Sequence, residues 1–150
     1  MKEYRVGIIG ATGMVGQRFI TLLENHPWFH IAALAASAHS AGKTYKEAIG
    51  KRWMMAEPIP EDVSGMVVLD AQADAEKIAG MVDFVFCAVN MKKEETLRLE
   101  EMYARLEGPV MSNNSANRHT PDVPMIIPEI NGEHAAVIEA QRKRLGTKRG

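Results

Sequence analysis

A glycine-rich loop between an apolar run and an amphipathic run constrains the fold of this chain most strongly. The apolar run ends at Gly10, two further glycines follow at Gly13 and Gly16, and helical periodicity extends over Met14 to Glu24. A strand, a glycine loop and a helix in this order predict a dinucleotide site, because a Cβ would keep a pyrophosphate away from the first helical amides. We expect Gly10 to make the tight turn, Gly13 to expose backbone N–H groups, and Gly16 to let the helix pack against its strand. A glycine-rich turn without a ligand is the alternative.

Composition excludes several classes of protein. The 150 residues are enough for one domain with a normal core, and the net charge of −1 gives no electrostatic reason to expect nucleic acid or an anionic membrane as a partner. A single cysteine excludes an internal disulfide and a cysteine-cluster metal site, and it fits a reducing, cytoplasmic compartment. No apolar run is long enough to span a membrane, and no signal or transit peptide is expected before the first strand.

The remaining pattern alternates short apolar runs with helical ones. This alternation predicts an α/β fold, namely a Rossmann-like open parallel sheet with helices on both faces. On the helix expected over Met91 to Leu106, the longest one, we expect an apolar stripe and the surface ion pairs Glu94–Arg98 and Glu101–Arg105. We expect Asn131 to cap the last helix. The expected strands are Phe29 to Ala36, Met66 to Leu69, Val82 to Val89 and Val110 to Ser112, and the expected helices are Thr44 to Ile49, Asp74 to Ala79, Met91 to Leu106 and the one after Asn131.

The loop after the second strand bears on the choice of dinucleotide. Domains that prefer NAD usually place a carboxylate there to hold the ribose hydroxyls. Here the loop instead carries Ser37, His39, Ser40 and Lys43. These groups can donate to a 2′-phosphate or neutralise it, so the sequence favours NADP over NAD. A polar loop without a ligand is the alternative.

Cys87 lies near the carboxyl end of an apolar strand, the end at which ligands bind in open α/β sheets. Its neighbours are apolar and nothing nearby would lower its pKa. We therefore expect Cys87 to be a small packing residue beside the cofactor, and we expect Ala88 to contact the cofactor. We assign no catalytic residue and no metal ligand within the chain.

A second polar loop follows the fifth strand and contains Asn114 and Arg118. Because parallel strands end at one edge of a sheet, this loop should face the same rim as the glycine loop. An arginine there can bind a phosphate through two parallel donors, although polar loops with one arginine are also common without a ligand. The basic residues near the C-terminus are expected to form a solvated helix end.

Taken together, these stretches closely resemble the N-terminal half of aspartate-β-semialdehyde dehydrogenase, of the type shared by archaea, fungi and some bacteria. The resemblance spans essentially all 150 residues in the expected order. It rests on four motifs, which are Gly10-Ala-Thr-Gly-Met-Val-Gly16, Ala36-Ser37 with Ser40-Ala-Gly-Lys43, Ser112-Asn-Asn-Ser115 with Arg118, and Val123-Pro124 with Pro128-Glu-Ile-Asn131.

The resemblance implies reductive dephosphorylation of aspartyl-β-phosphate by NADPH, giving the semialdehyde and phosphate. It assigns the pyrophosphate to the segment from Thr12 through Met14 to Val15, and the substrate phosphate to Arg118 with Asn114 lining the site. It assigns the 2′-phosphate to Ser37 and Ser40 with Lys43 or His39. His39 stands where relatives often have arginine, which weakens the case for tight 2′-phosphate binding.

In that family the nucleophilic cysteine lies in an Asn-Cys turn just after a segment resembling Lys148-Arg149-Gly150. A histidine acid/base and the dimer contacts come from a second domain. We therefore expect residues 1–150 to be an NADP-binding domain without the catalytic and dimerisation domain, inactive alone, and the full-length enzyme to be a homodimer or homotetramer.

Two other interpretations stay open at this point. One is a different reductase, such as N-acetyl-γ-glutamyl-phosphate reductase; a short-chain reductase would need a Tyr-x-x-x-Lys motif, which is absent. The other is a non-catalytic NADP-binding module.

Overall fold

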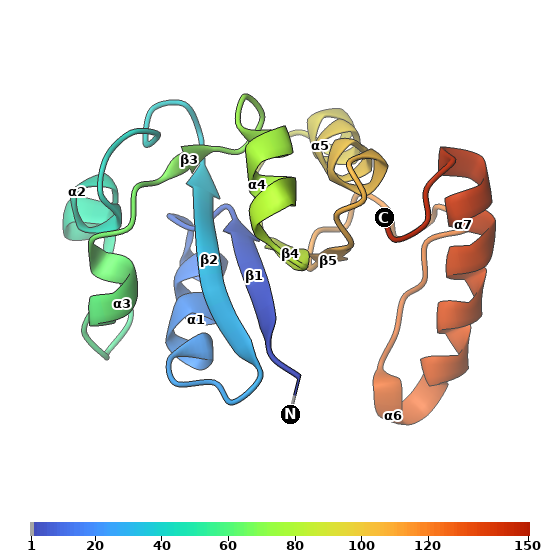
Figure 1. Cartoon of the computed structure of the whole chain (residues 1–150), viewed down its shortest axis with the longest axis horizontal. Coiled ribbons are helices and arrows are strands. Elements are labelled where there is room, and N and C mark those ends of the chain that lie inside the picture. The colour runs from blue at the N-terminus through green and yellow to red at the C-terminus, as the bar shows by residue number, and fades with distance from the viewer. Residues whose placement is uncertain (1) are drawn as a thin grey trace.

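A five-stranded parallel sheet forms the centre of the computed structural model, which describes residues 2–150 (Figure 1). The strand order is β3-β2-β1-β4-β5, and every neighbouring pair is parallel. This order confirms the expected Rossmann-like sheet. The strands are β1 (Tyr4–Ile9), β2 (Phe29–Ala36), β3 (Leu69–Asp70), β4 (Phe84–Cys87) and β5 (Val110–Ser112).

Helices cover both faces of the sheet. On one face, Ile20 of α1 and Tyr45 of α2 are buried together with Ile8 and Leu34 of the sheet. On the other face, Ile78 of α4 is buried with α5 and with the other sides of β1, β2 and β4. The helices are α1 (Met14–Leu23), α2 (Tyr45–Ile49), η1 (Gly50–Arg52), α3 (Glu61–Ser64), α4 (Ala75–Met81), α5 (Lys93–Arg105), α6 (Pro128–Asn131), η2 (Gly132–Val137) and α7 (Ile138–Leu145).

The chain changes direction across the sheet at β1. It proceeds from β1 to β2 and β3 on one side, and then crosses to β4 and β5 on the other side. Ile9, Cys87 and Ser112 pair in register at the ends of β1, β4 and β5. The loops that follow these three strands therefore meet at one edge, and the glycine loop lies at the topological switch point.

Some sequence-based expectations are wrong in detail. The strand expected over Met66 to Leu69 is only Leu69–Asp70 in the sheet, because Val67 forms an isolated antiparallel bridge with Thr44 instead. Asn131 does not cap the last helix, since its side chain instead accepts from the N–H of Ile127, at the start of α6, at 2.7 Å.

The long helix agrees with its pattern more closely. Leu99 and Tyr103 are buried on its apolar stripe, and Arg105 pairs with Glu101 at 2.8 Å. The expected Glu94–Arg98 pair is not among the ion pairs formed by residues 2–150. Solvent competes effectively for such exposed pairs, so they are weakly specified.

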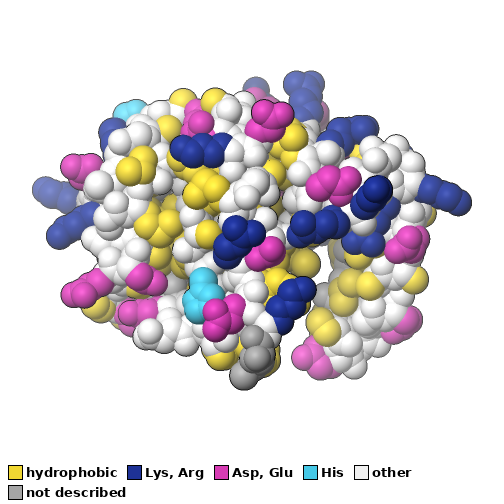
Figure 2. All heavy atoms as spheres, viewed as in Figure 1, with side chains coloured by type: hydrophobic (Ala, Val, Ile, Leu, Met, Phe, Trp, Pro, Cys, Tyr) yellow, Lys and Arg dark blue, Asp and Glu magenta, His cyan; other side chains and the backbone are white. Residues whose placement is uncertain are grey.

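The C-terminal segment, α6 to α7, forms an arm beside the sheet (Figure 1). Arg144 binds Asp122 with Nη2–Oδ1 at 2.8 Å, and the Glu107 carboxylate accepts the backbone N–H of Lys148 at 3.0 Å and of Arg149 at 2.6 Å. A cleft of about 550 Å³ separates the arm from β5 and α5, and the hollow is visible in the space-filling view (Figure 2). Positive and negative side chains are interspersed over this face (Figure 2).

Candidate functional site

Gly10 and Gly16 are required by close packing within the protein. Gly10 has a φ of +89°, and a Cβ there would lie 2.5 Å from the carbonyl oxygen of Ala88. A Cβ on Gly16 would lie 2.2 Å from the carbonyl oxygen of Gly10. Both positions therefore exclude any side chain, as expected for a tight turn and for a helix packed against its own strand.

Gly13 is different, because the protein itself leaves room for a side chain there. The nearest atom to a Cβ at this position is Gly10 O at 3.5 Å, which is an ordinary contact, and the residue is exposed. Packing therefore does not explain why this position is glycine. A ligand that approaches the backbone closely would explain it.

The first turn of α1 presents unpaired amides to this open space. The N–H of Gln17 is the first to bond within the helix, to Gly13 O at 2.9 Å, so the amides of Met14, Val15 and Gly16 precede the helical ladder. Within residues 13–23, no side chain caps α1 and no acidic residue lies in its first turn. An exposed helix N-terminus without a cap or a carboxylate fits an anion such as a pyrophosphate.

Two buried side chains brace the glycine loop, and sequence reasoning did not identify them. Gln17 donates to the carbonyl oxygens of Thr12 at 3.1 Å and Arg52 at 3.0 Å, and it accepts from Met54 N at 2.8 Å. The Tyr45 hydroxyl donates to Ala11 O at 2.8 Å. A glutamine on the otherwise apolar inward face of α1 is the one sequence signal that could have indicated the first brace.

The loop after β2 lies next to the glycine loop. Both Gly10 N and Ala11 N donate to Ala35 O, at 2.9 and 3.0 Å, so the two strand ends are joined. In the loop, Ser37, His39 and Lys43 are exposed, and Lys43 Nζ donates to His39 O at 3.0 Å. Ser40 is only 3% exposed, so the other three side chains are the ones open to a ligand.

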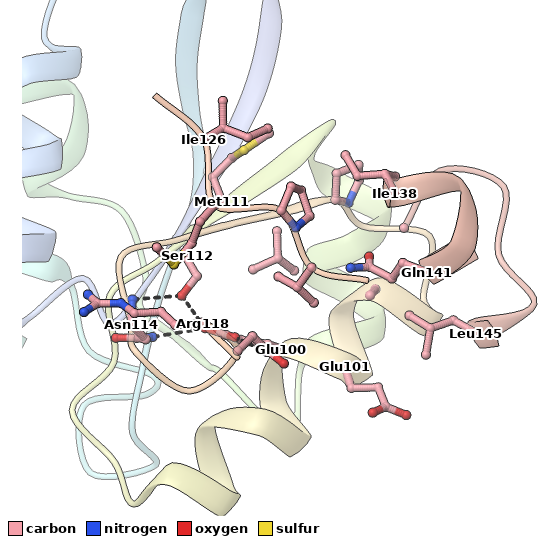
Figure 3. Close-up of a pocket in the computed structure, with 18 of the residues that line it drawn as sticks. Glu100, Glu101, Met111, Ser112, Asn114, Arg118, Ile126, Ile138, Gln141 and Leu145 are labelled. Atoms are coloured by element: carbon pink, nitrogen blue, oxygen red, sulfur yellow. Dashed lines mark hydrogen bonds between the residues drawn. The ribbon is translucent and has the colours of Figure 1, made fainter. Parts of the chain in front are cut away.

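The loop after β5 lies at the same edge and lines one end of the cleft (Figure 3). Asn114 Nδ2 lies 3.6 Å from Cys87 Sγ, and Asn113 N donates to Cys87 O at 3.3 Å, which holds the loop against the end of β4. Arg118 is exposed, and its Nη2 lies 3.5 Å from Asn113 O. In the strand order, β4 lies between β1, which the glycine loop follows, and β5, which this loop follows. Ala88, directly after β4, therefore lies between the two loops.

Comparison with known proteins identifies the family. A sequence model described as the NAD binding domain of semialdehyde dehydrogenase matches residues 5–138. The chain belongs to this family.

Curated relatives are longer than this semialdehyde dehydrogenase domain. The aspartate-semialdehyde dehydrogenase of Methanothermobacter thermautotrophicus is 43% identical over 94% of the chain and 38% of its own length. The enzyme of Archaeoglobus fulgidus is 41% identical over 96% of the chain and 40% of its own length. The chain thus spans about two fifths of the length of these relatives.

A solved structure supports the fold assignment. The crystal structure of aspartate-semialdehyde dehydrogenase with NADP from Candida albicans superposes with a TM-score of 0.83 at 36% identity. The superposition includes 99% of the present chain and 40% of the Candida albicans chain. The resemblance drawn from the glycine loop and the Asn114–Arg118 loop is therefore confirmed.

Cys87 of this semialdehyde dehydrogenase domain is a poor nucleophile. It is 1% exposed, and burial, with a smaller contribution from the charge of Glu100, raises the pKa of its thiol to about 12. The thiol therefore stays protonated at neutral pH. Among residues 2–150 no group of three or more His, Cys, Asp or Glu is placed to hold a metal, and no helix is long and apolar enough to cross a bilayer.

Alkylation should distinguish a packing cysteine from a reactive one. At pH 8 we expect Cys87 in the folded domain to react with iodoacetamide at least about 100 times more slowly than in denaturant, because both burial and the raised pKa suppress the thiolate. Mass spectrometry after a timed quench measures the rate. Labelling of the native domain as fast as of the unfolded chain would show that the thiol is accessible.

Proposed function

We propose that this domain binds NADP(H) and forms the nucleotide-binding part of an aspartate-semialdehyde dehydrogenase, which converts aspartyl-β-phosphate to the semialdehyde and phosphate. The observation that carries the proposal is the uncapped first turn of α1 at Gly13, where the protein leaves open space next to the first helical amides. The names of the relatives and the NADP in the Candida albicans structure support the choice of reaction and cofactor.

The cofactor would bind across the ends of β1 and β2. The amides of Thr12, Met14 and Val15 would hold the pyrophosphate, since hydrogen bonds from backbone N–H groups at a helix N-terminus suit a divalent anion. Exposed Ser37, His39 and Lys43 would receive the 2′-phosphate, and the loop residues 37–43 include no carboxylate that would repel it. Bound NADPH would supply the hydride.

The substrate would be held by the loop after β5. Arg118 would bind its phosphate through paired N–H donors, and Asn114 would line the same site. Both residues line the cleft at the edge that also carries the glycine loop. Their proximity to the end of β4 would bring the substrate phosphate towards the nicotinamide end of the cofactor.

The 150-residue chain by itself should bind nucleotide without turnover. Its one cysteine is buried and protonated, so it cannot supply the thiolate that the family resemblance assigns to acyl transfer. Among rival reductases, N-acetyl-γ-glutamyl-phosphate reductase is disfavoured by relatives named as aspartate-semialdehyde dehydrogenases. In a longer protein containing this domain, comparing oxidation of the two semialdehydes would decide between them.

Calorimetric titration of the domain with NADPH and NADH tests the cofactor assignment. We expect NADPH to bind at least about tenfold more tightly, because the exposed Lys43 can neutralise the 2′-phosphate. Lys43→Glu should remove this preference, because it replaces the cation by a carboxylate that would repel the 2′-phosphate.

The matched control is Lys46→Glu, which makes the same charge change on the exposed surface of α2. It should keep the NADPH preference of the parent. Equal or tighter binding of NADH by the unmodified domain would overturn the proposal.

A further inference from the structure

Glu100 is an acidic residue that the proposed reaction leaves without a role. It lies on α5, is only 6% exposed, and takes part in none of the ion pairs of residues 2–150. Instead, three neutral side chains of the loop after β5 donate to its carboxylate. These are Ser112 Oγ, Asn114 Nδ2 at 3.2 Å and Asn117 Nδ2 at 2.7 Å.

A buried carboxylate without a cation is costly, and an apolar side chain would serve the core at least as well. The loop residues Ser112, Asn114 and Asn117 compensate this cost only while they remain where the structure has them. The hydrogen bonds that Glu100 makes to this loop therefore explain the carboxylate better than its packing does.

The carboxylate also determines which way the two amides point. Both of its oxygens accept hydrogen bonds, and Asn114 and Asn117 turn their NH₂ groups towards them. The oxygen of Asn117 then accepts from Thr120 Oγ1 at 2.9 Å, and the oxygen of Asn114 is directed away from Glu100. Asn114 Nδ2 is further used by the contact with Cys87 Sγ.

These contacts enclose the turn that carries Arg118. Asn117 immediately precedes it, and Arg118 N donates to Ser115 O at 3.2 Å. On the other side of the turn, Ser112 Oγ accepts from Asn114 N at 3.0 Å while it donates to Glu100. Figure 3 shows Glu100 on the helix facing Ser112, Asn114 and Arg118 at the end of the cleft.

We propose that Glu100 is a positioning residue that holds the Ser112–Arg118 loop in its phosphate-binding shape and directs the oxygen of Asn114 towards the ligand. This inference rests on the proposed role of Arg118 in binding the substrate phosphate. The long, regular helix α5 gives the carboxylate a rigid base. The loop therefore keeps its shape before a ligand arrives, which lowers the entropic cost of binding.

Glu100→Gln tests the proposal in the NADPH-loaded domain, with inorganic phosphate as the probe. Whichever way the new amide turns, its Nε2 would face an amide donor, either Asn117 Nδ2 or Asn114 Nδ2. We therefore expect phosphate to bind about tenfold more weakly while NADPH affinity stays within about twofold. The Arg118 side-chain NMR signals report phosphate binding. Glu101→Gln is the matched control one residue along α5, on an exposed pair with Arg105, and should bind phosphate like the parent.

The double variant Glu100→Gln with Asn117→Asp exchanges donor and acceptor across the same contact. The amide introduced on α5 would donate to the carboxylate introduced in the loop, which still accepts from Thr120, so all partners are matched again. We expect the double variant to recover at least about half of the lost phosphate affinity, counted on a logarithmic scale. A general packing defect would not be rescued by a second substitution.

Failure of the two proposals can be told apart. Unchanged phosphate binding in Arg118→Gln would remove the proposed role of Arg118 and, with it, the role of Glu100. Loss of phosphate binding in Arg118→Gln together with parent-like binding in Glu100→Gln would overturn the Glu100 proposal alone. If Glu100→Gln does not fold, Asn117→Ala tests the same contact from the loop side, and parent-like binding by it would also overturn the proposal.

Discussion

Replacement of Gly13 by aspartate should abolish NADPH binding while leaving the domain at least as stable as the parent. Gly13 is the N-cap of α1 with φ −75° and ψ 163°, a conformation in which aspartate is a favourable cap. Its carboxylate would bond the free first-turn amides and stabilise the helix by about 1 kcal/mol. The same carboxylate would occupy the pyrophosphate position and repel it, so we expect affinity to fall at least about a hundredfold.

Thermal unfolding and calorimetric titration of the same sample measure the two effects. The matched control is Gly65→Asp, which adds the same group at an exposed glycine with open space around it, and it should bind NADPH like the parent. Retained NADPH affinity in Gly13→Asp would mean that the nucleotide does not use this helix N-terminus. The opposite signs on stability and on binding distinguish this result from simple misfolding.

Gly16→Ala should destabilise the domain strongly, because the protein leaves no room there for an added methyl group. The new Cβ would lie 2.2 Å from Gly10 O and 2.8 Å from Ala11 Cα, both backbone atoms that cannot rotate away. Either α1 moves off β1 or the tight turn deforms. We expect the free energy of unfolding to fall by about 3 kcal/mol, which lowers Tm by about 6 to 12 °C for a domain of this size.

The same substitution in another helix provides the control. Gly80 lies in α4 with no atom within 4 Å of an added Cβ, so Gly80→Ala should raise stability by about 0.5 to 1 kcal/mol through helix propensity. Chemical denaturation of both variants measures the difference. A Gly16→Ala variant as stable as the parent would contradict the close packing of α1 on the loop.

Local patterns were sufficient to predict the framework of this domain. The apolar run over Phe29–Ala36 is the observed β2, and the stripe with Leu99 and Tyr103 is the buried face of α5. These features follow from periodicity and from turn chemistry, which act within a few residues. The weakest predictions were at element ends such as Met66 to Leu69, where a contact with Thr44 decided the outcome.

The sequence by itself determined the fold class, the glycine loop and the family, because each depends on residues close together in the chain. Only the tertiary structure separated Gly13, which has room for a side chain, from Gly10 and Gly16, which do not, since that distinction depends on contacts with Ala88 and within the turn. It also identified Gln17 and Glu100, whose partners include residues on distant elements such as Arg52 and Asn117. A polar residue on a helix looks the same in sequence whether it faces water or a loop, and burial against specific donors is what gives it a role.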